Sequence, residues 1–345
     1  MSTQLETSTV TPEPAAAELS YREAICAALS DEMAADATVL LMGEDVAEAG
    51  GVFKTSEGLV DRFGRERVRN TPICENGFVG VALGLAVTGF RPVVEIMFSD
   101  FLPTAGDAIV NELPKFRFMS GGQCSVPITV RSIGGSSGRF GTQHSATGES
   151  WYMALPGLKV VTAGTPDSAY SLLRAAIRED DPVLFFEHRG LYGRKALVDR
   201  SDANVAGVGK AHVARAGTDV TIVATLMMLD RALQAAALLQ EEGVSAEVVD
   251  LRWLRPFDEE TVQQSLARTG RLVIVEEQLH DAGWGASLIS RLARSGSYPA
   301  ASTRVLSLPE HLLVPYTPRL EDELVPSAAR IADAAREVVG AGAPS

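Results

Sequence analysis

Cysteine is scarce in this sequence of 345 residues, and what there is lies scattered. Cys26, Cys74 and Cys124 are an odd number, far apart, and no Cys-x-x-Cys occurs. Small secreted folds rely on closely spaced, paired cysteines, and zinc sites on clustered ones. The pattern therefore excludes a disulfide framework, gives no support to a zinc site, and predicts a cytoplasmic location.

Long apolar runs are missing as well. The uncharged segment 76–90 is shorter than the roughly 20 residues that a membrane helix needs, and glycine interrupts it at four positions. Residues 1–18 are rich in Thr, Ala, Pro and Glu and lack both the apolar core of a signal peptide and an Arg-rich amphipathic pattern. We expect no membrane association, and a disordered tail over residues 1–18.

Basic residues are fewer than acidic ones. The sequence has 31 Lys and Arg against 44 Asp and Glu, which gives a net charge of −13. Nucleic-acid binding needs clustered basic residues, and here they are dispersed among acidic ones. We therefore exclude nucleic acid as the main partner. The composition, 46% hydrophobic and 22% charged, is that of a globular protein, and the length predicts about two domains.

Two series of alternating strand and helix patterns run along the chain. Such alternation is typical of α/β domains built around a mainly parallel sheet. The first series has extended runs at 38–42, 92–97, 126–132, 158–163 and 182–187, with helical spacing at 21–33 and 167–178. The second has extended runs at 220–225, 246–251, 272–276 and 303–308, with helical spacing at 229–242, 259–268, 286–294 and 328–339. We predict one α/β domain over 19–190, a linker over 191–217 and a second α/β domain over 218–340.

Two short glycine patterns suggest other functions. Gly134, Ser136 and Gly138 match the Gly-x-Ser-x-Gly nucleophile elbow of hydrolases, but a glycine-rich loop follows where that elbow needs a helix. Gly283 and Gly285 resemble the start of a dinucleotide fingerprint that lacks its third glycine, and a tight turn before a helix explains them. The hydrolase remains as a minor alternative.

The segment 71–80 (TPICENGFVG) carries more information. Pro72 favours an extended conformation at Thr71, so Glu75 is expected at a turn from strand to helix. An acid there can simply interact with the helix N-terminus, which contributes about 0.3–1 kcal/mol. Alternatively the carboxylate has a chemical role, and glycines at 77, 80 and 84 form a helix face that something can approach closely.

This segment belongs to an ordered set of longer motifs. The others are 91–101 (RPVVEIMFSDF), 118–123 (FMSGGQ), 141–145 (GTQHS) and 156–161 (PGLKVV), together with 43–46 (GEDV) and 181–183 (DPV). From about residue 20 to 339 the sequence resembles the beta subunit of the thiamine-diphosphate-dependent decarboxylating component of 2-oxo acid dehydrogenase complexes. Pyruvate, branched-chain 2-oxo acid and acetoin dehydrogenases share this family.

The resemblance implies a fold and a set of partners. The fold would be a transketolase-type pyrimidine-binding domain followed by a transketolase C-terminal-type α/β domain, in an α2β2 heterotetramer. Thiamine diphosphate would lie between chains, with the alpha subunit binding diphosphate and Mg²⁺ through a Gly-Asp-Gly…Asn motif. Gly-Asp-Gly occurs nowhere in this sequence, so the chain is expected to form half of a shared site.

The resemblance also assigns residues. Glu75 matches the glutamate that shares a proton with N1′ of the aminopyrimidine. Phe101 and Ile73 match positions beside that ring, although Phe101 can equally be a core phenylalanine. His144 matches a histidine at the substrate end of the site, where an imidazole can transfer protons near neutral pH.

Some family members bind structural potassium, and the resemblance places that site at Ile128, Ala176, Ile177, Glu179 and Asp181. Here the acidic spacing departs from the common Asp-x-Asn, so potassium is an option rather than a requirement. Pro114 replaces a small residue, and we expect it to kink or end its helix. Arg139, Arg189 and Arg194 have no assigned role near the expected substrate mouth.

The function that the resemblance implies is decarboxylation of a 2-oxo acid, followed by transfer of the acyl group to the lipoyl groups of a dihydrolipoyl acyltransferase core. Two alternatives remain. One is an acetoin-cleaving homologue, and the other is a non-catalytic interaction subunit that docks the alpha chain and the acyltransferase core. The presence of both Glu75 and His144 argues against the second.

Overall fold

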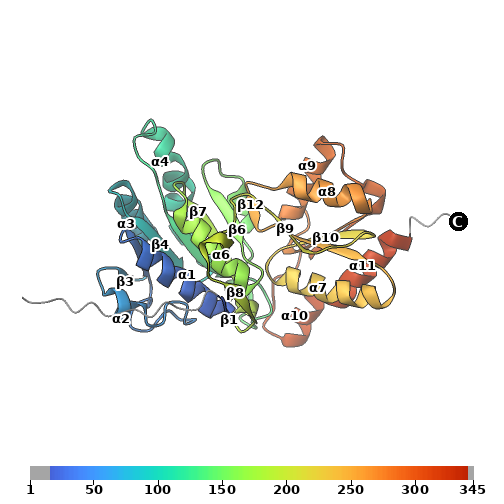
Figure 1. Ribbon diagram of the computed structural model, residues 1–345, viewed down its shortest axis with the longest axis horizontal. Helices are drawn as coiled ribbons and strands as arrows, with labels where there is room; N and C mark the ends of the chain where they lie inside the picture. Colours follow the sequence, from blue (N-terminus) through green and yellow to red (C-terminus); the bar gives the residue numbers. More distant parts are fainter. Residues whose placement is uncertain (1–15, 341–345) are drawn as a thin grey trace, which may run out of the picture.

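The computed structural model describes residues 16–340, which form two α/β units side by side (Figure 1). The first fifteen residues of the predicted tail lie outside the described residues. Residues 16–18 belong to strand β1 (Ala16–Ser20), although the predicted tail extended to residue 18. No helix of the described residues is long and apolar enough to span a membrane.

A sheet of seven strands forms the centre of the first unit, in the order β12-β6-β7-β5-β4-β2-β3. All neighbouring pairs are parallel except β12 with β6. The strands are β2 (Val39–Gly43), β3 (Val68–Asn70), β4 (Arg91–Ile96), β5 (Thr129–Gly134), β6 (Lys159–Thr162), β7 (Val183–His188) and β12 (Trp253–Arg255). Each extended run predicted for this half overlaps one of these strands, whereas β3 and β12 were not predicted.

Helices cover both faces of this sheet, which is why its strands are apolar without alternation. Leu41, Val93 and Phe185 point into one buried cluster, and their neighbours Leu40, Val94 and Phe186 point into the other. The helical elements are α1 (Tyr21–Ala35), α2 (Leu59–Phe63), α3 (Glu75–Val87), η1 (Ser99–Ala105), η2 (Ala108–Glu112), α4 (Leu113–Met119), η3 (Thr142–His144), α5 (Glu149–Met153) and α6 (Pro166–Arg178).

Local capping explains where the two long helices of the first face begin. Ser20 and Glu23 form a reciprocal capping box at the start of α1. Thr165 caps α6, Pro166 occupies its first turn, and Asp167 is the first-turn acid that the sequence predicts. Both helices therefore start within one residue of the predicted positions.

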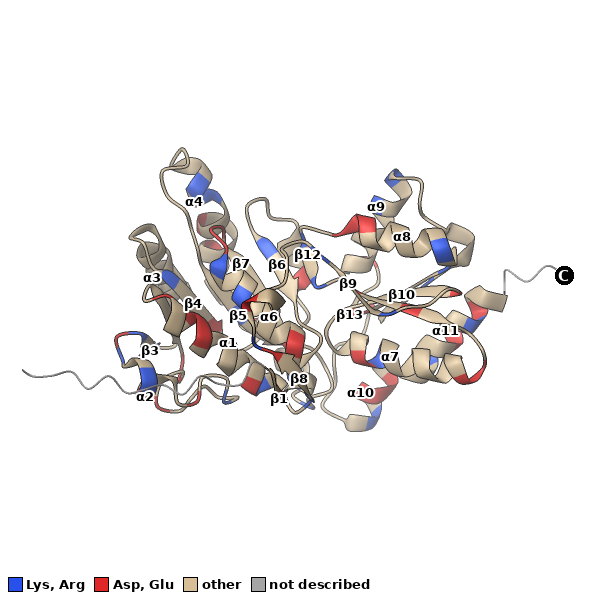
Figure 2. Cartoon of the chain, in the orientation of Figure 1, with Lys and Arg blue, Asp and Glu red and all other residues tan. Residues whose placement is uncertain are grey.

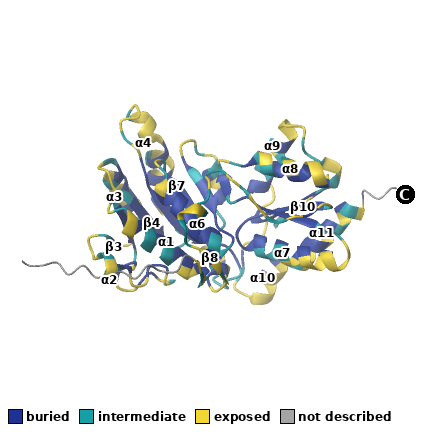
Figure 3. Cartoon of the chain, in the orientation of Figure 1, coloured by how far each residue is buried: buried dark blue, intermediate teal, exposed yellow. Residues whose placement is uncertain are grey.

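The second unit is built on a five-stranded sheet in the order β14-β13-β10-β11-β9, with only β9 antiparallel. Its strands are β9 (His212–Arg215), β10 (Val220–Ala224), β11 (Ala246–Asp250), β13 (Leu272–Leu279) and β14 (Thr303–Leu308). Its helices are α7 (Leu226–Glu241), α8 (Glu259–Thr269), α9 (Trp284–Arg294), α10 (Pro318–Leu324) and α11 (Ala328–Gly340). Figure 3 shows the strands of both sheets buried and the exposed residues gathered on helices and loops. The predicted α/β fold class is confirmed.

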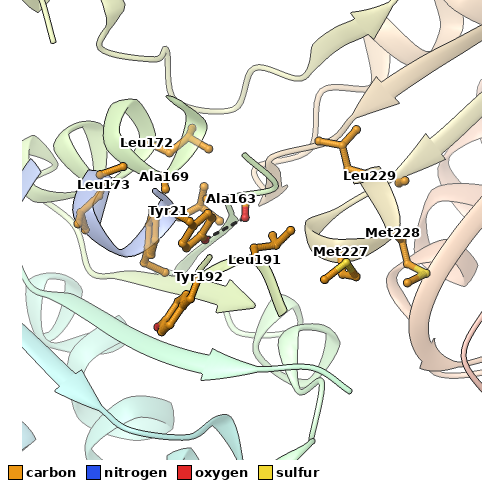
Figure 4. Close-up of a cluster of buried hydrophobic side chains, with 14 of the residues drawn as sticks. Tyr21, Ala163, Ala169, Leu172, Leu173, Leu191, Tyr192, Met227, Met228 and Leu229 are labelled. Atoms are coloured by element: carbon orange, nitrogen blue, oxygen red, sulfur yellow. Dashed lines mark hydrogen bonds between the residues drawn. The ribbon is translucent and has the colours of Figure 1, made fainter. Parts of the chain in front are cut away.

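One hydrophobic core continues from the first unit into the second. In Figure 4, Met227 of α7 lies near Leu191, and Met228 and Leu229 belong to the same buried cluster as Leu191 and Ala163. At the same place the Tyr21 hydroxyl donates to the Ala163 carbonyl at 3.0 Å. Strand β12 adds a second connection, because it comes from the C-terminal half of the chain and pairs with β6 of the first sheet.

The predicted linker contains two strands. Strand β8 (Lys195–Asp199) pairs with β1, and β9 completes the edge of the second sheet. The boundaries 19–190, 191–217 and 218–340 stay a prediction. Figure 2 shows Lys and Arg interspersed with Asp and Glu on the helices of both units.

Two sequence features have local explanations. Pro114 does not end its helix, because the turns before it widen into the π-helical segment η2 and Pro114 lies in the first turn of α4. Gly283 and Gly285 lie against the Glu276 carboxylate, where a Cβ at Gly283 would come within 2.4 Å of its oxygens. These glycines thus serve a close turn before α9.

Candidate functional site

The candidate site lies along the side of the first sheet that is formed by the C-terminal ends of its parallel strands. This side is called the edge of the sheet below. Strands β3, β2, β4, β5 and β7 are successive neighbours and all parallel. The segments that follow them include Glu44 after β2, Glu75 after β3, Phe98 and Phe101 after β4, His144 after β5, and Arg189 after β7. Side chains far apart in the sequence are thereby collected along one edge.

Glu75 is the first residue of α3, and its side chain is half-buried. Within residues 16–340 its carboxylate accepts no hydrogen bond and forms no ion pair, and Cys74 before it provides no side-chain cap. Burial raises the pKa of the nearby Glu44, and the charge of Glu75 raises it further. Glu75 is therefore at the predicted strand-to-helix turn, with its carboxylate unpartnered.

Phe101 and His144 lie together in an aromatic cluster. The imidazole of His144 meets the ring of Phe98 edge to face at 4.7 Å and that of Phe101 at 5.5 Å between ring centroids. Phe101 is half-buried, so the position is intermediate between a core residue and a free surface. Sequence reasoning did not single out Phe98, although Phe98 lies within segment 91–101.

The element that carries Phe101 packs against the helix that carries Glu75. Turn η1 contacts α3, and the Asn76 side chain accepts a hydrogen bond from the backbone N–H of Ala108 at 3.2 Å. Ile73 precedes α3, and its side chain is 82% exposed. The structure thus brings Phe101 and His144 into contact and places Glu75 on the adjoining element.

Asp100 and a cavity border the His144 loop. Burial raises the pKa of Asp100, whose carboxylate accepts from the backbone N–H of Ala146 at 3.1 Å. The cavity measures about 360 Å³ and lies between the two units. Its lining includes Asp100, Thr142, Ser145, Trp151, Leu279 and Leu313.

The three arginines without an assigned role have different surroundings. Arg139 pairs with Glu321 and Asp322, and Arg194 pairs with Asp230 at 2.8 Å. Arg189 instead lies over the ring of Phe140, 3.2 Å from its centroid, and one of its terminal nitrogens is buried without a hydrogen-bond partner in residues 16–340. Burial lowers the pKa of Arg189. The Phe140 ring meets that of Phe98 at 6.0 Å between centroids, so Arg189 belongs to the aromatic cluster.

The environment of Ser136 contradicts the hydrolase alternative. Ser136 is buried, and its hydroxyl donates to Glu277 at 2.5 Å. His188 contacts the other oxygen of the same carboxylate at 2.7 Å. A serine nucleophile needs a histidine as its base, whereas here the carboxylate lies between the two.

The residues expected for potassium are close together, but other groups already use their oxygens. Arg91 donates to the carbonyls of Ile177 and Glu179 at 3.3 and 2.9 Å. The Lys159 ammonium bonds the Glu179 and Asp181 carboxylates at 2.6 and 2.9 Å. The carbonyl of Ile128 accepts from Val183 and that of Ala176 from Glu179. These oxygens thus already accept hydrogen bonds from Arg91, Lys159 and backbone N–H groups, and potassium at this position stays a prediction.

Comparison with known proteins agrees with this architecture. Residues 17–195 match the family described as transketolase, pyrimidine binding domain, and residues 209–331 match transketolase, C-terminal domain. A solved structure of a split-gene transketolase, described as an inactive beta4 tetramer, has the same fold, with a TM-score of 0.76 at 23% identity over 94% of this chain and 99% of that one. The fold is therefore that of the transketolase-type two-domain proteins.

Relatives of known activity identify the family within the transketolase-type proteins. The chain is 44% identical to pyruvate dehydrogenase E1 component subunit beta-2 of Oryza sativa, over 93% of this chain and 86% of that protein. It is 40% identical to the E1 component subunit beta of Rhizobium meliloti, over 93% and 70%. It is 39% identical to acetoin:2,6-dichlorophenolindophenol oxidoreductase subunit beta of Cupriavidus necator, over 95% and 99%. The chain belongs to the family of beta subunits of thiamine-diphosphate-dependent pyruvate and acetoin dehydrogenase E1 components.

Proposed function

We propose that this chain is the beta subunit of a 2-oxo acid dehydrogenase that decarboxylates its substrate and transfers the acyl group to lipoyl groups. The observation that carries the proposal is the sheet edge at which Glu75, Phe101 and His144 are collected. An acid, an aromatic surface and an imidazole together suit a site that binds a heteroaromatic ring and transfers protons.

The residues present fit one part of thiamine diphosphate. The unpartnered Glu75 carboxylate offers a proton-sharing group to a ring nitrogen, and Phe101 offers a flat apolar surface. The described residues hold no group of three His, Cys, Asp or Glu side chains that could bind a metal, and the sequence has no Gly-Asp-Gly. We therefore assign the aminopyrimidine to this chain, and the diphosphate with its Mg²⁺ to an alpha subunit.

The roles of the residues follow from this assignment. Thiamine diphosphate, when bound, supplies a nucleophilic carbon and accepts the electrons released by decarboxylation. Glu75 holds a proton at N1′ of the aminopyrimidine, which a carboxyl group can do and an amide cannot. Phe101 and Ile73 orient the ring. His144 holds or moves a proton at the substrate and positions the substrate carboxylate.

The exposed side of α3 supports assembly with another chain. From Phe78 to Val87 the helix has no polar side chain, and Val81 is 55% exposed. Gly80 and Gly84 are exposed too, and a Cβ at either would meet nothing within 4 Å. An apolar helix face with small residues allows a second helix to approach closely, which is consistent with the proposed α2β2 heterotetramer.

Two substrates are candidates, a 2-oxo acid and acetoin. Pyruvate dehydrogenase and acetoin oxidoreductase subunits are similar to this chain at nearly the same identity. We place 2-oxo acids first and keep acetoin as the second candidate. A purely structural subunit is disfavoured because the Glu75 carboxylate has no hydrogen-bond or ion-pair partner within residues 16–340. We propose a cytoplasmic location, and a dihydrolipoyl acyltransferase core as the second partner.

The test is reconstitution with an alpha chain that carries Gly-Asp-Gly…Asn. The purified complex would be given pyruvate, branched-chain 2-oxo acids and acetoin in turn, and reduction of a dye and acylation of a lipoyl domain would be measured. We expect dye reduction with one of the 2-oxo acids and acylation of the lipoyl domain. A complex that assembles, binds thiamine diphosphate and acts on none of them would refute the proposal.

A further inference from the structure

The loop that carries His144 has a conformation that its own sequence does not favour. Residues 135–148 connect β5 to α5 with only the short turn η3 between them. Ser137 has φ +70° and Arg139 has φ +61°, and neither is a glycine. Left-handed backbone costs a non-glycine residue about 1–2 kcal/mol, so contacts from outside must hold the loop in this conformation.

Both left-handed residues are held by the same side chain. Glu321 of α10, in the second unit, accepts from the backbone N–H of Ser137 with one oxygen. Its other oxygen accepts from the Arg139 guanidinium at 2.6 Å. The Glu321 side chain is only 1% exposed, whereas Arg139 is 35% exposed. Glu321 is thus a buried carboxylate whose contacts are made to the strained part of the loop.

Further contacts from the same region hold the loop on either side. Arg139 also donates to the Pro318 carbonyl at 3.0 Å and to Asp322 at 2.7 Å. The Thr142 hydroxyl donates to the Val314 carbonyl at 3.1 Å. Tyr316 covers Gly141 so closely that a Cβ there would lie 2.4 Å from its ring. The segment 314–322 therefore forms a clamp on the loop.

The clamp is connected to His144 through Gly141. The Gly141 carbonyl accepts from the His144 backbone N–H at 3.3 Å and from the Ser145 hydroxyl at 2.8 Å. The imidazole contacts the rings of Phe98 and Phe101 and interacts electrostatically with Asp100, and within the described residues it forms no hydrogen bond. The backbone of the loop consequently decides where the imidazole lies.

We propose that Glu321 is a positioning residue, which holds the loop of residues 135–148 so that His144 stays at the substrate end of the site. The inference rests on the proposed function for its catalytic consequence, but its structural part stands on its own. The second unit thereby contributes to a site whose reacting groups all come from the first.

The test uses the complex of this chain with its alpha partner. In Glu321→Gln we expect faster amide hydrogen exchange over residues 135–148, and acyl transfer slower by about 10²-fold, the scale of a misplaced catalytic group. Hydrogen–deuterium exchange at C2 of thiamine diphosphate should be unchanged, because it depends on Glu75. Glu323→Gln is the matched control, since Glu323 lies on the same helix and its carboxylate pairs with the exposed Arg319 at 3.0 Å.

A double-mutant cycle separates positioning from general damage. If Glu321 acts through His144, Glu321→Gln should cause no further loss of acyl transfer in the His144→Ala background. Equal losses in both backgrounds would overturn the proposal, as would unchanged loop exchange. If Glu321→Gln does not fold, Arg139→Gln removes the exposed partner and should give the same pattern.

The outcomes also distinguish this proposal from the proposed function. Full activity of His144→Ala would refute the catalytic role of His144. Amide hydrogen exchange over residues 135–148 in Glu321→Gln would then show whether the clamp holds the loop. An impaired His144→Ala with a normal Glu321→Gln would refute the clamp alone.

Discussion

Glu75 begins helix α3 and His144 lies in the loop after β5, and the two side chains have different neighbours. Glu75 is near a second acid, Glu44, whereas His144 contacts the rings of Phe98 and Phe101. A carboxyl group suits proton exchange with the cofactor ring, and an imidazole suits proton transfer at the substrate. Substitutions at the two positions are therefore expected to affect different steps.

Glu75→Gln should lower turnover by about 10²–10⁴-fold, because an amide cannot share a proton with N1′. Assembly with the alpha chain should persist. Hydrogen–deuterium exchange at C2 of the bound cofactor isolates the affected step, and Glu66→Gln serves as a control at an acid that is 96% exposed. Exchange at the wild-type rate would reduce Glu75 to an acid at a helix N-terminus.

His144→Ala should leave cofactor binding and C2 exchange near normal while acyl transfer falls. A dye-reduction assay and reductive acylation of a lipoyl domain measure decarboxylation and transfer separately. The exposed His280, which pairs with Asp281, provides the control His280→Ala. Full activity in both assays would show that His144 is only a loop residue.

The buried Glu149 makes the free energy of unfolding depend on pH. Burial raises the pKa of Glu149 from 4.5 to about 7. Across that window the folded chain keeps a proton that the unfolded chain has lost, so the free energy of unfolding falls as pH rises. Glu276, also raised to about 7, acts in the same direction.

Glu149→Gln removes one of these protons, and its amide can still bond Gln278. Thermal unfolding measured from about pH 5 to about pH 8 should therefore show a weaker decline in the variant than in the wild type. Identical slopes would mean that Glu149 does not titrate in this range.

At the scale of elements, α3 joins the site to the expected interface. Its buried side packs on the first sheet and its other side is apolar, exposed and lined by glycine. Gly80→Leu should leave the fold of the isolated chain unchanged, because nothing lies within 4 Å of its added Cβ, and should weaken assembly with the alpha chain. Size-exclusion chromatography measures both, with Gly340→Leu at the exposed end of α11 as control.

A Gly80→Leu chain that assembles normally would remove α3 from the interface. Loss of the isolated chain's own thermal transition would instead show that Gly80 is needed for folding.

Elements with a strong local pattern were predictable. Strands such as β4 and β7 are short apolar runs buried on both faces, and α1 and α6 carry capping residues, so local sequence determines them. Strand β12 was missed because its three residues are extended only through pairing with β6, far away in the sequence. Local patterns carry no information about such a partner.

Some residues of the candidate site can likewise be found from local sequence, and others depend on contacts between distant parts of the chain. Glu75, Phe101 and His144 lie in recognisable motifs, and their placement at one edge follows from parallel strands. Phe98 packs against His144 only in the folded chain. Glu321 accepts a hydrogen bond from the backbone N–H of Ser137, which lies 184 residues earlier in the sequence. Tertiary contacts, which a single sequence does not reveal, select these residues.

At the scale of the whole molecule, the two units share a hydrophobic core and several hydrogen bonds. A single core cluster runs from α1 to α11, and the loop after β5 is bonded to the second unit at Glu277 and Glu321. Glu75, Phe101 and His144 are nevertheless only half-buried in this chain, and its sequence has no Gly-Asp-Gly to bind diphosphate. The central claim is therefore that this chain holds half of a cofactor site.

Titration calorimetry with thiamine diphosphate and Mg²⁺ tests that claim most directly. The purified chain alone should show weak binding or none, since the diphosphate carries most of the ligand's charge and this sequence has no Gly-Asp-Gly to bind it. The chain together with its alpha partner should bind tightly, and only when Mg²⁺ is present. Tight Mg²⁺-dependent binding by this chain alone would contradict the account, because the site would then be complete within one subunit.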